Sequence, residues 1–503
     1  MESLQEISVT NGIVSHLFEK VIMPPKPAYT AKIALVGIGL EEHFDWQSII
    51  KSYDIAKKKL EAVLPQDRFK LLTSQKPLQT KEEIHKWLQS MHAEGIDGII
   101  IYQASFIAGD LAATLARWLN QNKIPVLSWS HDEPTGGRLV NNRLCGQNFL
   151  LNIFNSCGVK YSWIFESPED IEFESNIMMF AKSVYAIASI NQRSIGMIGG
   201  FRVPGFYDCE LNELALLNRF GIKVDRIDFD TIWQHGERFT DNTIKEIQDT
   251  LLNHPLCKFN NVTDEQMQKS IRLSLAMADY ARENDYLGIG LKNWPELFDH
   301  FGIAGDGAGA LVQDLGIPVA DESDMGALLT MIIMNQISFG KSIPTLVDLS
   351  LVNDKQNRIG FWHCGGAPTK LINEATGFEI RNHSILENFS EESSMGMLLE
   401  FLQKHGPITV AKYQYPDASK VLTWEGEIHE SKMAFRGSYA EVFPEKNDSG
   451  DILSTVLSNG LDHHWIIGRG HLQKELNELN HWLGIKEIEI EKRKHHLYGH
   501  SNR

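Results

Sequence analysis

Short apolar runs alternate with amphipathic runs in the first part of the chain, and this alternation most constrains the fold. Residues 32–37, 98–102 and 124–128 are apolar in succession, as in strands that are covered on both faces. Longer segments with helical spacing, such as 46–64 and 111–120, lie between these runs. Strands that alternate with helices form parallel βαβ units, so the sequence predicts Rossmann-like α/β domains.

The pattern begins anew near Tyr161 and changes character beyond about residue 345. Strand-like segments such as 408–413 and 420–424 then dominate until a helical segment at 473–483. A chain of 503 residues is also too long for one ordinary hydrophobic core. We therefore expect three domains: an N-terminal α/β domain (1–160), a central α/β domain (161–345) and a mainly β C-terminal domain (346–503).

The composition excludes several classes of protein. With 48 basic and 65 acidic residues the net charge is −17, which disfavours a nucleic-acid or anionic-membrane partner. The five cysteines are scattered without a Cys-x-x-Cys pair, so neither a disulfide framework nor a thiolate zinc site is indicated. The N-terminus lacks the features of a signal peptide, and no stretch approaches the roughly 18 apolar residues of a membrane span. We expect a cytoplasmic protein.

Three residues of the metal-ligand type stand far apart in the sequence: Glu296, Asp324 and His463. Two carboxylates and one imidazole suit an octahedral Mn²⁺ or a similar divalent ion, and they leave coordination positions open for a substrate. Glu296 directly follows the strand-like run 286–291, and ligands commonly bind at the carboxyl ends of parallel strands. Taken singly, each has an ordinary explanation as a first-turn acid, a helix cap or a packed histidine.

The histidines leave a choice open. His463 and His464 are neighbours in a strand-like segment, so their side chains face opposite sides and only one of them enters a given site easily. His363, in the segment 361–366, is a further metal-capable residue close to a strand-like run. This distribution favours a site at a junction between domains.

Three segments, in this order, resemble the L-fucose isomerase and L-arabinose isomerase superfamily. They are residues 288–297, 318–328 and 460–464. The order of two α/β domains and a mainly β third domain is similar as well. The resemblance therefore extends over nearly the whole chain.

The resemblance implies a metal-dependent aldose–ketose isomerase that acts on an open-chain sugar through a cis-enediol intermediate. Glu296 and Asp324 correspond to the carboxylates that both ligate the metal and move protons, and His463 corresponds to the metal histidine. Mn²⁺ or another divalent cation is the implied cofactor. A homo-oligomer is implied too.

The resemblance also ranks the alternatives. Its Glu-x-Asp phase favours Asp324 over Asp321 and Glu322 as the second carboxylate, and its glycine spacing favours His463 over His464. Because the distance from Asp324 to the following glycine is one residue shorter than in the family, Asp321 and Glu322 stay open as ligands.

The family acts on pentoses, 6-deoxyhexoses and related sugars, and a C6-modified hexose such as sulfoquinovose is a further candidate. The arginines of the loop 133–143 offer forked hydrogen bonds to an anionic C6 group, although surface arginines are common in such loops. The candidate substrate-binding residues are Glu42, His43, Arg138, Arg143, His363 and His464.

Two other functions are compatible with the residues. A non-catalytic sugar-binding protein also has two α/β domains around a cleft, but it does not need acids and a histidine to meet at a metal. A metal-dependent sugar lyase or hydrolase uses similar ligands, and it cleaves a bond where an isomerase exchanges isomers.

Overall fold

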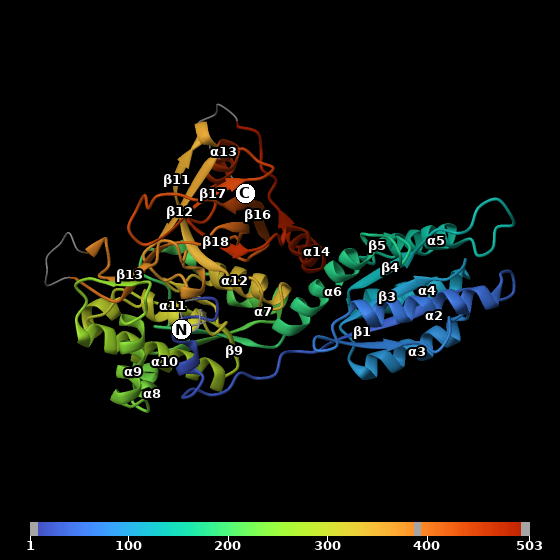
Figure 1. Cartoon of the computed structure of the whole chain (residues 1–503). Coiled ribbons are helices and arrows are strands. Elements are labelled where there is room, and N and C mark those ends of the chain that lie inside the picture. The colour runs from blue at the N-terminus through green and yellow to red at the C-terminus, as the bar shows by residue number, and fades with distance from the viewer. Residues whose placement is uncertain (1–8, 387–393, 494–503) are drawn as a thin grey trace, which may run out of the picture. The chain divides into compact units, whose positions relative to one another are not determined.

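The computed structural model describes residues 9–386 and 394–493, which form two compact units (Figure 1). One unit consists of residues 27–189 and 474–482, and the other contains the described residues 9–26, 190–386, 394–473 and 483–493. None of the helices in the described residues combines the length and the apolar character that a membrane span requires. The three-domain division of the chain stays a prediction.

The N-terminal unit has a five-stranded parallel sheet in the order β2-β1-β3-β4-β5. Its strands are β1 (Ala31–Ile38), β2 (Phe69–Thr73), β3 (Gly98–Gln103), β4 (Val126–Ser130) and β5 (Ser162–Phe165). Its helices are α2 (Trp46–Val63), α3 (Lys81–Glu94), α4 (Gly109–Asn122), α5 (Arg143–Ser156), α6 (Phe173–Ile190) and α14 (Gln473–Leu483). Every residue of β3 and β4 is buried, which explains why both runs are apolar throughout.

The second unit begins with a four-stranded parallel sheet in the order β10-β9-β6-β7. Its strands are β6 (Ser194–Ile198), β7 (Lys223–Ile227), β9 (Tyr286–Leu291) and β10 (Val319–Asp321). The helices of this part are α1 (Ser15–Phe18), α7 (Glu213–Phe220), α8 (Phe229–Gly236), α9 (Asp241–Leu252), α10 (Asp264–Glu283), α11 (Asp306–Gln313) and α12 (Met325–Ile337), with the short turns η2 (Tyr207–Cys209) and η3 (Leu297–Phe301).

A ten-stranded, mainly antiparallel sheet completes this unit, in the order β19-β16-β15-β18-β11-β12-β17-β14-β13-β8. Because β16 pairs with β17 as well as with β15, six of these strands close into a barrel. The strands are β8 (Cys257–Phe259), β11 (Thr345–Asn353), β12 (Arg358–His363), β13 (Phe378–Arg381), β14 (Leu398–Leu402), β15 (Gly406–Tyr413), β16 (Lys420–Ile428), β17 (Ser438–Pro444), β18 (His464–Arg469) and β19 (Lys486–Glu487), with the helix α13 (Ser449–Asn459) and the turns η4 (Asp354–Gln356) and η5 (Thr369–Leu371).

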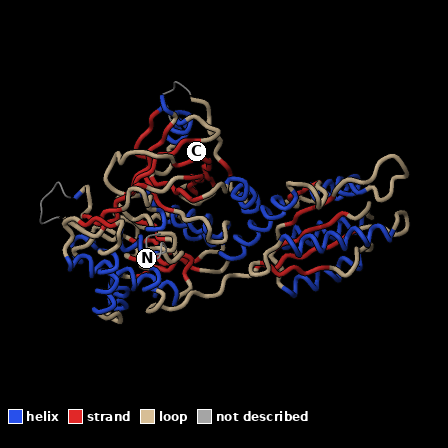
Figure 2. The backbone as a smooth tube through the Cα atoms, in the orientation of Figure 1, coloured by secondary structure: helices blue, strands red, loops and turns tan. Residues whose placement is uncertain are grey.

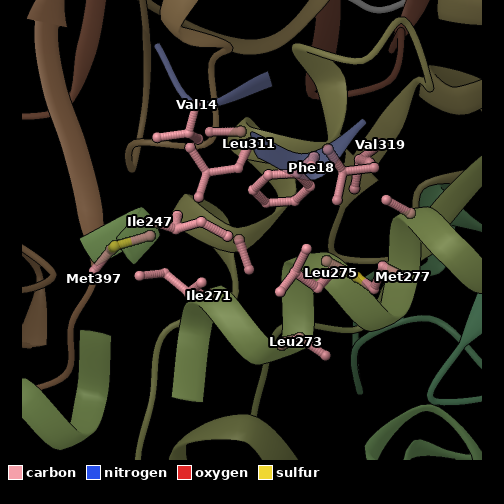
Figure 3. Close-up of a cluster of buried hydrophobic side chains, with 14 of the residues drawn as sticks. Val14, Phe18, Ile247, Ile271, Leu273, Leu275, Met277, Leu311, Val319 and Met397 are labelled. Carbon is pink, nitrogen blue, oxygen red and sulfur yellow. The ribbon is translucent and has the colours of Figure 1, made fainter. Parts of the chain in front are cut away.

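The predicted fold class is confirmed, since parallel α/β sheets precede a β-rich C-terminal part (Figure 2). The N-terminal segment contributes to the core of the second unit: Val14 and Phe18 pack in the same buried cluster as Leu311 and Val319 (Figure 3). This apolar packing fixes the sheet ends from which the functional side chains project.

Candidate active site

Three acids leave the carboxyl end of β10 within four residues. Asp321 ends the strand, and the next two residues, Glu322 and Ser323, have φ values of 60° and 55°. Such left-handed backbone is costly for residues other than glycine and is found where function or packing demands it. Asp324 then caps α12, because its Oδ1 accepts a hydrogen bond from the backbone N of Ala327 at 2.7 Å. The turn thereby sends the three carboxylates in different directions.

His464 lies among three carboxylates. It is the first residue of β18 and is paired across the sheet with Asp348 of β11. Its Nδ1 is 2.9 Å from Asp324 Oδ2. Its Nε2 is 3.0 Å from Glu322 Oε2 and 3.7 Å from Asp348 Oδ1. The ring thus joins the acids that follow β10 to an acid of the barrel.

The electrostatics of this cluster favour a positive charge. Burial opposes the charged form of His464, but hydrogen bonds to Asp324, Cys209 and Glu322 outweigh it and raise the pKa of His464 well above 6.5. Burial likewise opposes the ionised form of Glu322, yet the hydrogen bond with His464 leads to a net lowering of the Glu322 pKa. The surrounding carboxylates therefore stabilise a proton on the ring, and they would stabilise another cation at the same place.

Asp324 is occupied by other groups of the chain. Besides its helix cap and its contact with His464, Oδ2 accepts a hydrogen bond from Lys412 Nζ at 2.5 Å. The Lys412 side chain is fully buried on β15. A second carboxylate oxygen, Asp462 Oδ2, is 3.9 Å from Lys412 Nζ. Burial opposes the ionisation of Asp324, but Lys412 and His464 together lower its pKa far below the ordinary value. This carboxylate orients the imidazole in the way that carboxylates orient metal-bound histidines.

The residues around His464 fit a divalent metal ion. Glu322, His363 and His464 each offer a ligand atom within 4.8 Å of the others, and all three are buried. Asp348 Oδ1 is buried and has no hydrogen-bond partner among the described residues, so it is a free acceptor next to His464 Nε2. Carboxylate oxygens with imidazole nitrogens suit Mn²⁺ and related divalent ions.

His463 lies on the outer side of this cluster. Its Nδ1 is 2.7 Å from Asp208 Oδ2, and 43% of its side chain is exposed. Its ring lies against that of His464, with 3.9 Å between the centroids and an angle of 41° between the planes. It also makes a T-shaped contact with Phe206, with 5.2 Å between the centroids. The structure therefore brings His464, and not His463, among the acids that follow β10.

Glu296 pairs with a lysine at the carboxyl end of β9. Its Oε1 accepts a hydrogen bond from Lys292 Nζ, its Oε2 is buried without a hydrogen-bond partner among the described residues, and one third of its side chain is exposed. The same loop supports Glu322 directly, because Trp294 Nε1 donates to Glu322 Oε1 at 3.0 Å and Asn293 Oδ1 accepts from the Glu322 backbone N at 3.0 Å. The loop around Glu296 thus positions Glu322.

The candidate residues of the N-terminal unit lie in two places. Glu42 and His43 are exposed on the turn that follows β1, and Arg138 is exposed in the loop before α5. Arg143 is buried, and its Nε donates to the main-chain oxygen of Ala104 at 3.2 Å. Its guanidinium is therefore engaged by the fold itself.

Sequence reasoning did not single out Asp348 or Lys412. Both are lone charged residues within otherwise apolar strand segments, which is the only signal that the sequence contains. A charged residue in such a segment needs a partner when it is buried. The identity of that partner depends on strand pairing, which becomes visible only in the structure.

The sequence of this chain is similar to those of known proteins. Residues 51–191 match the family model described as fucose/sulfoquinovose isomerase, N-terminal domain. A sulfoquinovose isomerase of Alkalicoccus urumqiensis is 26% identical over 399 residues, which is 78% of this chain and 86% of that protein. Another, of Priestia aryabhattai, is 24% identical over 408 residues, with coverages of 80% and 88%.

Among solved structures, GanP, a glucose-galactose binding protein from Geobacillus stearothermophilus, aligns at 16% identity with a TM-score of 0.14. The alignment covers 62% of this chain and 90% of that protein.

Proposed function

Because the chain is a relative of the fucose and sulfoquinovose isomerases, we propose that it is a metal-dependent isomerase that converts an open-chain aldose into its ketose through a cis-enediol. The support for the aldose–ketose isomerase activity comes from these relatives, which are sulfoquinovose isomerases. The metal dependence is supported by one observation above all: His464 Nε2 lies between Glu322, at 3.0 Å, and Asp348, at 3.7 Å.

We assign the metal ligands to Glu322, Asp348 and His464. This assignment takes the place of the set predicted from the sequence, Glu296, Asp324 and His463. Glu296 Oε1 pairs with Lys292 and His463 pairs with Asp208. Asp324 Oδ2 is bound by Lys412 and His464. When bound, Mn²⁺ or another divalent cation polarises the oxygens on C1 and C2 of the sugar and stabilises negative charge that develops on them.

The two carboxylates beside His464 are the candidates for proton transfer. Glu322 is held ionised and is fixed by Trp294, so it can accept the proton from C2 of an aldose. Return of a proton at C1 then gives the ketose, and Asp348, at 32% side-chain exposure, is the second carboxylate within reach of the same region. Asp324 holds the imidazole and takes no proton in this scheme.

Sulfoquinovose, a hexose with an anionic C6 group, is the substrate that we propose. The support comes from the two relatives, which are sulfoquinovose isomerases that align over most of both chains. Pentoses and 6-deoxyhexoses are the alternatives within the same reaction. Cytoplasmic localisation and a homo-oligomer stay predictions.

The activity is tested by incubating the chelated and then Mn²⁺-reloaded protein with sulfoquinovose, L-fucose, L-arabinose and D-arabinose in D₂O. We expect metal-dependent formation of a ketose, most rapidly from sulfoquinovose, in NMR spectra. Deuterium incorporation at C2 in the reverse direction would support the enediol. Sugar binding that is indifferent to chelation, without turnover, would favour a binding protein, and cleavage products would favour a lyase or hydrolase.

The neighbouring histidines provide a matched pair for the ligand assignment. His464→Gln should weaken Mn²⁺ binding by about 10- to 100-fold or more, whereas His463→Gln should change it by less than about threefold. Isothermal titration of the metal-free variants measures both. The reverse ranking would restore His463 as the ligand.

A further inference from the structure

A second group of buried acids lies beside the proposed metal ligands. Asp306, the first residue of α11, is 0% exposed, and neither of its carboxylate oxygens has a hydrogen-bond partner among the described residues. A buried acceptor without a hydrogen-bond partner destabilises the fold, and a charged one does so more strongly. Two such oxygens on one buried side chain therefore call for a partner that the chain does not supply.

Two further unsatisfied atoms belong to residues of the neighbouring strands. Asp321 Oδ1, at the end of β10, is buried without a partner, and so is His363 Nδ1, at the end of β12. This nitrogen is 3.5 Å from Asp321 Oδ2. A Cβ atom at Gly366 would overlap Asp321 Oδ2, so the absence of a side chain at Gly366 makes room for the Asp321 carboxylate.

Three residues of this cluster are close enough to share one ion, and Asp321 lies next to them because its Oδ2 is 3.5 Å from His363 Nδ1. Asp306, His363 and Cys364 each offer a ligand atom within 4.8 Å of the others, and all three residues are buried. Ligand atoms at bond lengths of about 2.0–2.3 Å from a common divalent ion lie within such distances of one another. The possible donor atoms are carboxylate oxygens and an imidazole nitrogen, and the thiol of Cys364 lies next to them.

The chain offers weak alternatives for balancing this charge. The dipole of α11 favours a carboxylate at its N-terminus, but none of the described residues there supplies a hydrogen bond to the Asp306 oxygens. The two buried lysines among the described residues, Lys292 and Lys412, pair with other acids.

We propose that Asp306, Asp321 and His363 form a second divalent-cation site next to the ion expected at Glu322 and His464. His363 would bind through Nδ1, its unsatisfied nitrogen, with Asp306 and Asp321 as the oxygen donors. The donor set suits Mn²⁺ or Zn²⁺. The site rests on the proposed function only for the identity of the neighbouring ion, since its own atoms stand unsatisfied whatever the reaction.

The test is a count of bound metal. The full chain is stripped with a chelator, reloaded with excess Mn²⁺ alone, desalted and analysed by mass spectrometry for metal per chain. We expect two Mn²⁺ per chain in the wild type and one in Asp306→Asn. Asp348→Asn should also retain one, and the exposed control Asp241→Asn should retain two.

The outcomes separate the two proposals. One Mn²⁺ per wild-type chain, lost in Asp348→Asn and unchanged in Asp306→Asn, would overturn the second site and leave the proposed function intact. Two in the wild type that stay two in Asp306→Asn would also overturn it. Retention of every ion in Asp348→Asn would instead contradict the first site.

A spectroscopic measurement guards against a variant that fails to fold. Two Mn²⁺ ions that are close neighbours broaden each other's electron paramagnetic resonance signal. The wild type should therefore show a broadened spectrum, and the milder variant His363→Gln should restore the sharp six-line spectrum of an isolated ion. A sharp spectrum in the fully loaded wild type would overturn the proposal.

Discussion

The turn after β4 in the N-terminal unit and the turn after β10 in the second unit both gather charged residues at the carboxyl end of a parallel strand. After β4, the Glu133 carboxylate accepts hydrogen bonds from the backbone N of Asn141 at 2.9 Å and of Arg143 at 2.6 Å. Arg143 in turn donates to main-chain oxygens. These charged groups find their partners in the fold.

The acids after β10 differ, because part of their hydrogen-bonding capacity is left over. Glu322 and Asp324 are bound, but Asp321 Oδ1 has no partner among the described residues, and neither does Asp348 Oδ1 across the barrel. In both units the charged residues lie at the end of a strand. The two turns differ in whether the charged groups all have hydrogen-bond partners. Saturated charges indicate a structural role, whereas unsatisfied buried acceptors indicate a site for a ligand or an ion.

The largest expected effect concerns the acids after β10. Glu322→Gln keeps the shape of the side chain but removes its charge, so kcat should fall by about 10³-fold, as expected when a general base is lost together with a metal ligand. Glu296→Gln, the matched change in the adjacent loop, should lower kcat by less than about tenfold. Steady-state kinetics with Mn²⁺ in excess measures both, and a larger loss in Glu296→Gln would return the base to that residue.

Next in size is the buried ion pair behind the site. Lys412→Met leaves Asp324 without its fully buried partner, and breaking such a pair costs about 3–5 kcal/mol of stability. The midpoint of urea unfolding measures the change. The exposed pair of Lys245 and Asp249 is the control, and Lys245→Met should shift the free energy of unfolding by less than about 1 kcal/mol. Equal losses of stability in the two variants would mean that burial does not determine how much an ion pair contributes to stability.

Asp314 is an intermediate case, since it is hydrogen-bonded but forms no salt bridge among the described residues. Thr369 Oγ1 donates to it at 2.6 Å and the backbone N of Lys370 at 3.1 Å, yet burial raises the pKa of Asp314 to about 6. The folded state therefore holds this proton more tightly than the unfolded chain, whose aspartates titrate near about 3.9. Its stabilising contribution is complete below pH ~4 and is lost as the pH rises through ~6.

The change between pH 4 and pH 8 should amount to about 3 kcal/mol for this one group, from a difference of about two pKa units. Asp314→Asn should remove that part of the pH dependence, so the variant should gain stability relative to the wild type as the pH rises. Urea unfolding at several pH values measures the difference. A constant difference between the two proteins would contradict the raised pKa.

The smallest effects concern the saturated side. Arg143→Ala should destabilise the protein by about 2 kcal/mol, because buried main-chain oxygens lose a charged donor. Arg138→Ala, at an exposed position of the same loop, should change stability by less than about 0.5 kcal/mol. If Arg138→Ala raises KM for sulfoquinovose at least tenfold but not KM for L-fucose, the exposed arginine, and not the buried one, binds the anionic group.

The sequence predicted part of the site because some signals are local. Asp324 follows an apolar run and precedes a helix, which marks it as a helix cap as readily as a ligand, and it is in fact the cap of α12. The sequence leaves Glu322 open as a ligand, and the feature that distinguishes it is a left-handed backbone that its sequence neighbours do not reveal. The choice between His464 and His463 depends on the barrel strands, because strand pairing places His464 opposite Asp348.

Alternating apolar and amphipathic runs determined the parallel α/β architecture and the β-rich C-terminal part, because burial on one face or two leaves a direct imprint on residue order. The tertiary structure alone decided which charged residues meet. Asp348, His464 and Glu322 are far apart along the chain, and strand register and one left-handed turn bring them together. A shift of register by one residue would turn each side chain to the other face, so no local pattern can specify their meeting.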